Sequence, residues 1–205
     1  MVIPFSILQL EFTYGWFAGI MVVLEVENMN ICMYGASSTE LEKIYYDKAE
    51  DFGRTMAERG HGLVFGGGAT GLMGAAVRGV MAAGGYSLGI APTFFDKPGI
   101  LYENCSEFIF TQTMRERKQL MEDQADAFVM VPGGIGTYEE FFEILTLKQL
   151  GQHNKPIAVY NINGYYDLLE QMLRHTVEQG FMKAECLELF GILGDAGALL
   201  DYLEK

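Results

Sequence analysis

From residue 29 to the end of the chain, short apolar segments alternate regularly with longer amphipathic ones, and this constrains the fold more than any other feature. The apolar segments are short and almost unbroken, as expected for strands that are buried on both faces. Segments with apolar residues at helical spacing follow most of them. The alternation predicts an α/β fold: a single Rossmann-like domain with a doubly wound parallel sheet and right-handed crossovers.

The individual elements follow from this periodicity. Strands are expected at residues 30–34, 63–65, 87–91, 108–110, 127–131, 157–160 and 189–193. Helices are expected at residues 40–59, 70–83, 113–124, 138–150, 165–179 and 196–203. Residues 92–105 contain two prolines and are expected to form an irregular loop. No internal repeat or linker interrupts the pattern, so residues 29–205 are predicted to form one domain.

Residues 1–28 form an apolar extension without any Lys or Arg. A secretory signal has a positively charged start, and the longest uncharged run, residues 12–24, is shorter than the ~20 residues that span a bilayer. Two interpretations are open. The extension is an extra strand or helix packed on the domain or on a partner, or it lies upstream of a true start at Met29. The second is favoured because Met29 immediately precedes the first predicted strand.

Charge and cysteine content exclude several classes of function. The chain has 14 basic and 27 acidic residues, a net charge of −13, which argues against general nucleic-acid binding and against docking on anionic membranes. Any phosphate site must therefore be a local pocket. Cys32, Cys105 and Cys186 are far apart and odd in number, and the three histidines are equally scattered. We therefore expect a reducing, cytoplasmic location and no metal site.

A first glycine cluster follows the strand at residues 63–65. Gly66, Gly68 and Gly71 satisfy the GxGxxG pattern of dinucleotide-binding folds. Two observations argue against that function: the cluster follows the second strand of the pattern, and no acid stands about 20 residues further on, the nearest being Asp96. Two interpretations remain, an anion cradle at a helix N-terminus or close packing of helix on strand.

A second glycine cluster, residues 132–140 (PGGIGTYEE), follows the most apolar strand of the chain. Gly133, Gly134 and Gly136 are expected to take positive φ values and to let a ligand approach the backbone. Thr137 is expected to be the N-cap of the next helix and to add its hydroxyl to the helix N-terminal amides. A phosphate bound there would meet several hydrogen-bond donors.

Glu140 has two interpretations. Thr137-x-x-Glu140 is a capping-box pattern, in which the glutamate bonds back to the N-cap amide, and the pattern alone favours this structural role. In the functional interpretation, the carboxylate lies beside a bound phosphosugar and stabilises positive charge at the anomeric carbon. Glu139 and Glu143 are further candidates, although exposed helix acids are the default for both.

A basic run, Arg115, Arg117 and Lys118, precedes the strand at 127–131. Taken alone, such a run is typical of a solvated helix face. Arginine also offers a planar fork of donors that suits phosphate. Combined with a glycine loop, and without the GxxxxGK[ST] motif of triphosphate sites, the run indicates a monophosphate ester as ligand.

Residues 66–74 (GGGATGLMG), 114–118 (MRERK) and 132–140 together resemble the LOG (Lonely Guy) family of cytokinin riboside 5′-monophosphate phosphoribohydrolases. The likeness spans residues 29–205. It implies a homodimer, or a higher oligomer built from dimers, with a small nucleotide as partner and no cofactor. Such an enzyme cleaves the N-glycosidic bond of a nucleoside 5′-monophosphate, a cytokinin riboside 5′-monophosphate or AMP, to free base and ribose 5-phosphate.

The resemblance also implies roles for individual residues. Arg117 and Glu140 match the catalytic pair, with Glu140 facing the ribose and Arg117 orienting the substrate and keeping that carboxylate ionised. The substrate-binding set comprises Gly67, Gly68, Lys118, Gly133, Gly134, Gly136, Thr137, Glu139 and Thr146. Arg115 stands where plant members often carry His, and residues 92–107 do not align clearly with a segment that carries a binding glutamate in plant members. The preferred base is therefore left open.

Two other classes of function remain open for this sequence. A non-catalytic nucleotide or cofactor carrier on the same scaffold needs the glycine loop but not the Arg117–Glu140 pair. A purely structural protein leaves the glycine loops unexplained. Related families have also been labelled lysine decarboxylases, but that chemistry needs a lysine that forms a Schiff base with pyridoxal phosphate, and no lysine here has such a context.

Overall fold

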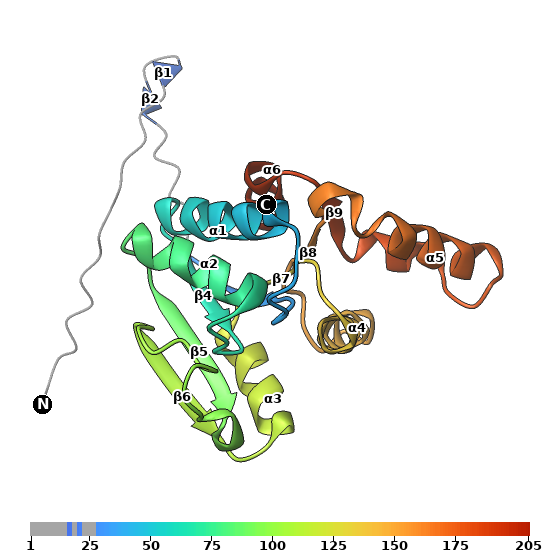
Figure 1. Ribbon diagram of the computed structural model, residues 1–205. Helices are drawn as coiled ribbons and strands as arrows, with labels where there is room; N and C mark the ends of the chain where they lie inside the picture. Colours follow the sequence, from blue (N-terminus) through green and yellow to red (C-terminus); the bar gives the residue numbers. More distant parts are fainter. Residues whose placement is uncertain (1–15, 18–19, 22–27) are drawn as a thin grey trace, which may run out of the picture.

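The computed structural model describes residues 16–17, 20–21 and 28–205. Seven strands form one parallel sheet in the order β6-β5-β4-β3-β7-β8-β9, which confirms the predicted doubly wound α/β fold (Figure 1). The strands are β3 (Asn30–Tyr34), β4 (Gly62–Phe65), β5 (Ser87–Pro92), β6 (Glu107–Thr111), β7 (Ala127–Met130), β8 (Ile157–Tyr160) and β9 (Gly191–Leu193). The α-helices are α1 (Lys43–Glu58), α2 (Gly71–Ala82), α3 (Met114–Gln124), α4 (Ile135–Gln149), α5 (Asp167–Glu178) and α6 (Ala196–Leu203).

Residues 1–28 are only partly described. Two short strands, β1 (Trp16–Phe17) and β2 (Ile20–Met21), pair in antiparallel fashion. The rest of the extension, residues 1–15, 18–19 and 22–27, lies outside the described residues. Both interpretations of this extension, and the domain boundary at residue 29, therefore remain predictions.

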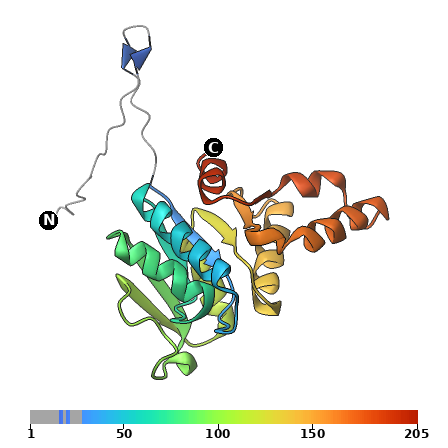
Figure 2. The same ribbon diagram turned by 45° about the horizontal axis from the view of Figure 1, so that its top comes forward.

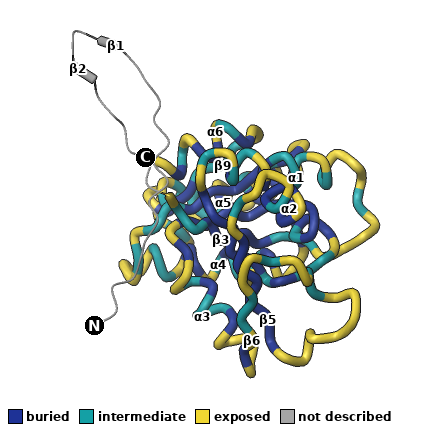
Figure 3. The backbone as a smooth tube through the Cα atoms, turned by 90° about the vertical axis from the view of Figure 1, so that its left-hand side faces the viewer, coloured by how far each residue is buried: buried dark blue, intermediate teal, exposed yellow. Residues whose placement is uncertain are grey.

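Helices cover both faces of the sheet, which explains why its strands are apolar throughout. In β3, Ile31 and Met33 pack with α1, α2 and α6, whereas Cys32 and Tyr34 face the layer formed with α3, α4 and α5. Figure 2 shows α1 and α2 side by side on their face of the sheet. In the burial view of Figure 3 the central strands lie buried inside, while the edge strand β6 and much of the outer helices and loops are partly or fully exposed.

Some element boundaries differ from the predicted ones. The expected helix at 40–59 begins only at Lys43, and the expected strand at 189–193 is shortened to β9 because a 3-10 helix, Ala184–Glu188, precedes it. The expected irregular loop starts with another 3-10 turn, Thr93–Phe95. Among the described helices, none is long and apolar enough to cross a membrane.

The strand order reverses at β3, which pairs with β4 on one side and with β7 on the other. In parallel α/β sheets, a crevice opens at such a point beyond the carboxyl ends of the strands. The loops that follow β3 and β7 meet there, and the Ala36 amide donates a hydrogen bond to the Pro132 carbonyl at 3.1 Å. This edge of the sheet is where a ligand site is expected.

A buried histidine, His61, lies at the other end of the sheet, where the strands begin. His61 Nδ1 accepts a hydrogen bond from the Met29 amide at 3.2 Å, and Nε2 lies 2.9 Å from Glu204 Oε1. Because Nδ1 accepts, the ring proton must lie on Nε2 and be donated to Glu204. Arg59 contacts both Glu204 and Asp201, so this network joins the start of β3 to the C-terminal segment of the chain.

Candidate active site

The second glycine cluster forms the turn from β7 into α4. The helix begins at Ile135 with Gly134 as its N-cap, so the prediction that Thr137 is the N-cap is wrong. Thr137 is the third residue of the helix and is buried. The predicted capping box of Thr137 and Glu140 is also absent, because Glu140 turns to a different partner. The first amides of α4 therefore belong to exposed residues, Gly134, Ile135 and Gly136.

The helix starts early because Thr137 packs back against the glycine loop. A Cβ atom on Gly133 would lie only 2.1 Å from Thr137 Oγ1, so position 133 has no room for a side chain. None of Gly133, Gly134 and Gly136 has a positive φ, so that expectation is wrong. A Cβ on Gly134 or Gly136 would meet nothing within 4 Å. The chain itself thus gives no reason for glycine at these two positions, and the space above them is open for a ligand.

Arg117 and Glu140 form a buried ion pair between α3 and α4. Arg117 Nη1 donates to Glu140 Oε1 at 2.6 Å, and the two side chains are only 8% and 12% exposed. Arg117 Nε donates to the carbonyl of Ile90, at the carboxyl end of β5, at 3.3 Å. The basic run is therefore not a solvated face at this position, although Arg115 is exposed. Arg117 is held by the protein on two sides and in turn fixes the Glu140 carboxylate.

Gly66, in the first glycine cluster, makes room for this pair. A Cβ atom at position 66 would lie 2.2 Å from Arg117 Nη2 and 3.2 Å from Cζ, well inside van der Waals contact. One amide at the helix N-terminus behind the cluster is already engaged, because the Leu72 amide donates to the Ala36 carbonyl at 2.8 Å. These contacts favour close packing over the anion cradle for the first cluster.

Burial dominates the electrostatics of Glu140. Its removal from water raises the pKa of the carboxyl, and the Arg117 guanidinium offsets this rise only in part. The pKa of Glu140 therefore lies above its ordinary value. The expectation that Arg117 keeps the carboxylate ionised is correct in direction, but it is outweighed by desolvation.

Lys118 forms a second ion cluster on the outer side of the pair. Its ammonium group contacts Glu139 and lies 2.7 Å from Glu143 Oε2. Partial burial lowers the pKa of Lys118, but the hydrogen bonds to the two carboxylates outweigh this and raise it overall. Lys118 and Glu139, both predicted to bind substrate, thus lie together one helical turn or less from the catalytic pair, and they bind each other.

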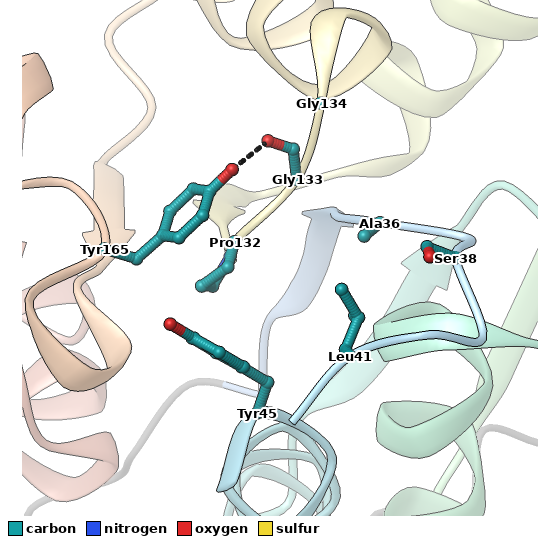
Figure 4. Close-up of a pocket in the computed structure, with 8 residues that line it drawn as sticks. All are labelled: Ala36, Ser38, Leu41, Tyr45, Pro132, Gly133, Gly134 and Tyr165. Carbon is teal, nitrogen blue, oxygen red and sulfur yellow. Dashed lines mark hydrogen bonds between the residues drawn. The ribbon is translucent and has the colours of Figure 1, made fainter. Parts of the chain in front are cut away.

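A cavity of about 160 Å³ opens at the point where the strand order reverses (Figure 4). It is mostly apolar and adjoins the glycine loop. The residues that line it are Ala36, Ser38, Leu41, Tyr45, Pro132, Gly133, Gly134 and Tyr165. Of the predicted site residues, only Gly133 and Gly134 line this cavity. Sequence reasoning missed the others, because no motif marks them.

The remaining predicted binding residues lie elsewhere. Thr146 is exposed, and its hydroxyl donates to the Phe142 carbonyl within α4 at 2.6 Å. The Gly67 carbonyl accepts a hydrogen bond from the Tyr102 amide, and Gly68 pairs with Leu101. Their roles in binding stay predictions. In the part of the chain that the structure describes, no three His, Cys, Asp or Glu side chains are grouped so that they could hold a metal ion.

The fold and this geometry define a class: a Rossmann-like α/β protein with an open glycine loop at a helix N-terminus and a buried Arg–Glu pair beside it. A family model described as "Possible lysine decarboxylase" matches residues 73–203. The chain is 38% identical over 175 residues to cytokinin riboside 5′-monophosphate phosphoribohydrolase LOG2 of Arabidopsis thaliana, covering 85% of this chain and 82% of that protein. It is 36% identical over 174 residues to the probable cytokinin riboside 5′-monophosphate phosphoribohydrolase LOGL3 of Oryza sativa subsp. japonica, with the same coverage.

The chain therefore belongs to the LOG family, as its motifs predict. Among solved structures, it resembles the molybdenum cofactor carrier protein of Chlamydomonas reinhardtii with a TM-score of 0.64 and 20% identity, covering 87% of this chain and 100% of that one. The molybdenum cofactor binding protein of Rippkaea orientalis gives a TM-score of 0.65 at 19% identity, over 85% and 95% of the two chains. At such identities the likeness concerns the fold alone.

Proposed function

We propose that this protein is a phosphoribohydrolase that cleaves the N-glycosidic bond of a nucleoside 5′-monophosphate with an adenine-type base. The buried Arg117–Glu140 pair is the observation that carries the proposal. It adjoins a glycine loop whose open amides suit a phosphate. Relatives that are 38% and 36% identical to this chain carry the name cytokinin riboside 5′-monophosphate phosphoribohydrolase, the second as a probable one. Both a cytokinin riboside 5′-monophosphate and AMP are proposed as substrates.

In the proposed mechanism, the 5′-phosphate binds at the N-terminus of α4, where the amides of Gly134 to Gly136 and the helix dipole favour an anion. Glu140 faces the ribose. As the bond from C1′ to the base nitrogen breaks, its electron pair leaves with the base, and the carboxylate stabilises the oxocarbenium-like sugar or attacks C1′. Water then supplies the new hydroxyl group at C1′, and the proton it releases ends on the nitrogen of the departing base. Arg117 holds Glu140 through Nη1 and is itself anchored through Nε to the Ile90 carbonyl, which leaves Nη2 available to orient the substrate.

The alternative is a non-catalytic carrier on the same fold. A carrier requires the glycine loop but gives no reason to bury an arginine and a glutamate together, because two desolvated charges are costly to bring out of water. The decarboxylase named by the family model would need a Schiff-base lysine. Lys118, the lysine nearest the pair in sequence, is engaged by Glu139 and Glu143.

Chromatography of reaction mixtures tests the proposal. The protein is incubated with AMP or with isopentenyladenosine 5′-monophosphate, beside Glu140→Gln and Arg117→Ala. We expect free base and ribose 5-phosphate from the parent and little from either variant. Glu170→Gln is the matched control, because Glu170 also pairs with an arginine, Arg174, but on the exposed surface of α5. Binding of nucleotide without turnover by the parent protein favours the carrier instead.

The oligomeric state and the cellular location of the protein are also proposals. We propose a homodimer or a higher oligomer of dimers, as the family resemblance implies, with the 88%, 76% and 87% exposed side chains of Ile135, Leu168 and Phe181 as candidates for buried interface residues. Analytical ultracentrifugation tests this. A cytoplasmic location is supported by three free cysteines, of which Cys32 has its pKa raised by burial to about 12 and stays a thiol.

A further inference from the structure

Two consecutive tyrosines, Tyr165 and Tyr166, donate hydrogen bonds to the backbone of the second glycine loop. Tyr165 and Tyr166 follow β8, and their hydroxyl groups donate to the carbonyls of Gly133 and Val131, each at 2.8 Å. Their rings pack edge to face, with centroids 4.9 Å apart. The Tyr166 amide in turn donates to the Asn161 side chain at 2.7 Å. The segment after β8 is therefore hydrogen-bonded to the loop at two carbonyls, those of Val131 and Gly133.

The two hydroxyl groups differ in their surroundings. Tyr166 is fully buried, as expected for a packing residue, whereas Tyr165 is 41% exposed and lines the cavity beside the loop (Figure 4). Because Tyr165 is partly open to solvent, packing of its ring does not by itself require that its hydroxyl bond to one backbone carbonyl. That carbonyl belongs to the peptide unit that joins Gly133 to Gly134.

The orientation of this peptide unit matters for the site. A trans peptide is planar, so its C=O and N–H point in opposite directions. When the Tyr165 hydroxyl holds the Gly133 carbonyl, it also fixes the direction of the Gly134 N–H, the first donor of the loop that leads into α4. A Cβ at position 134 meets nothing within 4 Å, so no side chain of the loop itself restrains this peptide from that side.

We propose that Tyr165 is a positioning residue for phosphate binding, which sets the Gly134 amide toward the phosphate of the ligand by fixing the Gly133–Gly134 peptide plane. This inference rests on the proposed function for the identity of the ligand. Tyr165 does not touch the reacting atoms in this scheme. Its loss should therefore weaken the binding of phosphate-bearing ligands and leave the chemical step unchanged.

Tyr165→Phe tests the proposal, with Tyr86→Phe as the matched control. Tyr86 is 40% exposed and also donates one hydrogen bond, to Glu107 at 3.0 Å. It precedes the amino end of β5, whereas the glycine loop lies at the carboxyl ends of the strands. For Tyr165→Phe we expect the KM for isopentenyladenosine 5′-monophosphate to rise about 3- to 10-fold, the value of one hydrogen bond. The kcat should stay within about twofold, and Tyr86→Phe should change neither constant.

Calorimetric binding of ribose 5-phosphate separates this inference from the proposed function. If the parent binds ribose 5-phosphate but hydrolyses no nucleotide, the proposed function fails, and the positioning role is still tested by a 3- to 10-fold weaker Kd in Tyr165→Phe, about the same factor as above. A lower kcat with unchanged KM, equal losses in both variants, or no binding of ribose 5-phosphate by the parent overturns the positioning role.

Discussion

Gly66→Ala gives a sharp test of how the catalytic pair is held. The substitution adds one methyl group at a position whose φ is ordinary for alanine, so the backbone is not strained. The new Cβ would lie 2.2 Å from Arg117 Nη2, whereas ordinary contact begins at 3.4 Å. The guanidinium must therefore move by about 1.2 Å. A shift of that size directed along the hydrogen bond to Glu140 lengthens it from 2.6 Å to about 3.8 Å, beyond hydrogen-bonding distance.

The cost follows from the kind of bond that is lost. A hydrogen bond to a charged group contributes about 1.5–3 kcal/mol. If it is needed in the transition state, its loss lowers kcat/KM roughly 10- to 100-fold. Base release measured by chromatography gives this number, and thermal unfolding checks that the fold persists. In an Arg117→Ala background the same glycine substitution should have no further effect, because the group it displaces is gone. Full activity of Gly66→Ala, or effects that simply add, would refute the steric argument.

Three further perturbations probe the site. In the proposed mechanism Glu140 acts as a carboxylate, and burial raises its pKa. On acidification, kcat/KM should therefore fall at a higher pH than it would for an ordinary carboxyl group. Arg117→Met removes the charge that lowers this pKa and should move the fall to still higher pH; a pH–rate profile measures both. Gly136→Ala should raise the free energy of unfolding by about 0.5–1 kcal/mol, since the position is helical and open, yet weaken nucleotide binding; urea unfolding and calorimetry separate the two effects. Tyr166→Phe should cost about 1–3 kcal/mol of stability in urea unfolding, because it leaves the buried Val131 carbonyl without that donor; a change below 0.5 kcal/mol contradicts this.

The fold could be predicted from the sequence because its signals are local. Buried strands read as unbroken apolar runs, and the helices between them keep their spacing, so the order of elements from β3 to α6 follows directly. The start of α4 could not be predicted in this way. Thr113-x-x-Glu116 and Thr137-x-x-Glu140 have the same pattern, yet only the first forms a capping box, with both hydrogen bonds at 3.2 Å.

Tertiary contacts decide between these two patterns. Glu140 lies opposite Arg117, a buried charge contributed by a different helix, and no spacing rule within α4 contains that information. The same reason hides Tyr165, whose hydroxyl reaches the glycine loop from 32 positions away in the sequence. The motifs predicted Arg117, Glu140 and the glycine loop as the candidate site, whereas the residues that hold them in place emerge only from the folded chain.

The buried His61 has a consequence for rearranging the protein. One imidazole ring contacts both the Met29 amide and the Glu204 carboxylate, so a single side chain links the residue before β3 to the residue after α6. This junction lies at the amino ends of the strands, whereas the glycine loop lies at their carboxyl ends. Domains whose ends meet in this way tolerate circular permutation. With the predicted domain start at residue 29, a chain in which residue 205 is joined to residue 29 through a short linker, with new ends in an exposed loop near the amino ends of the strands, should leave the Arg117–Glu140 pair and the glycine loop undisturbed.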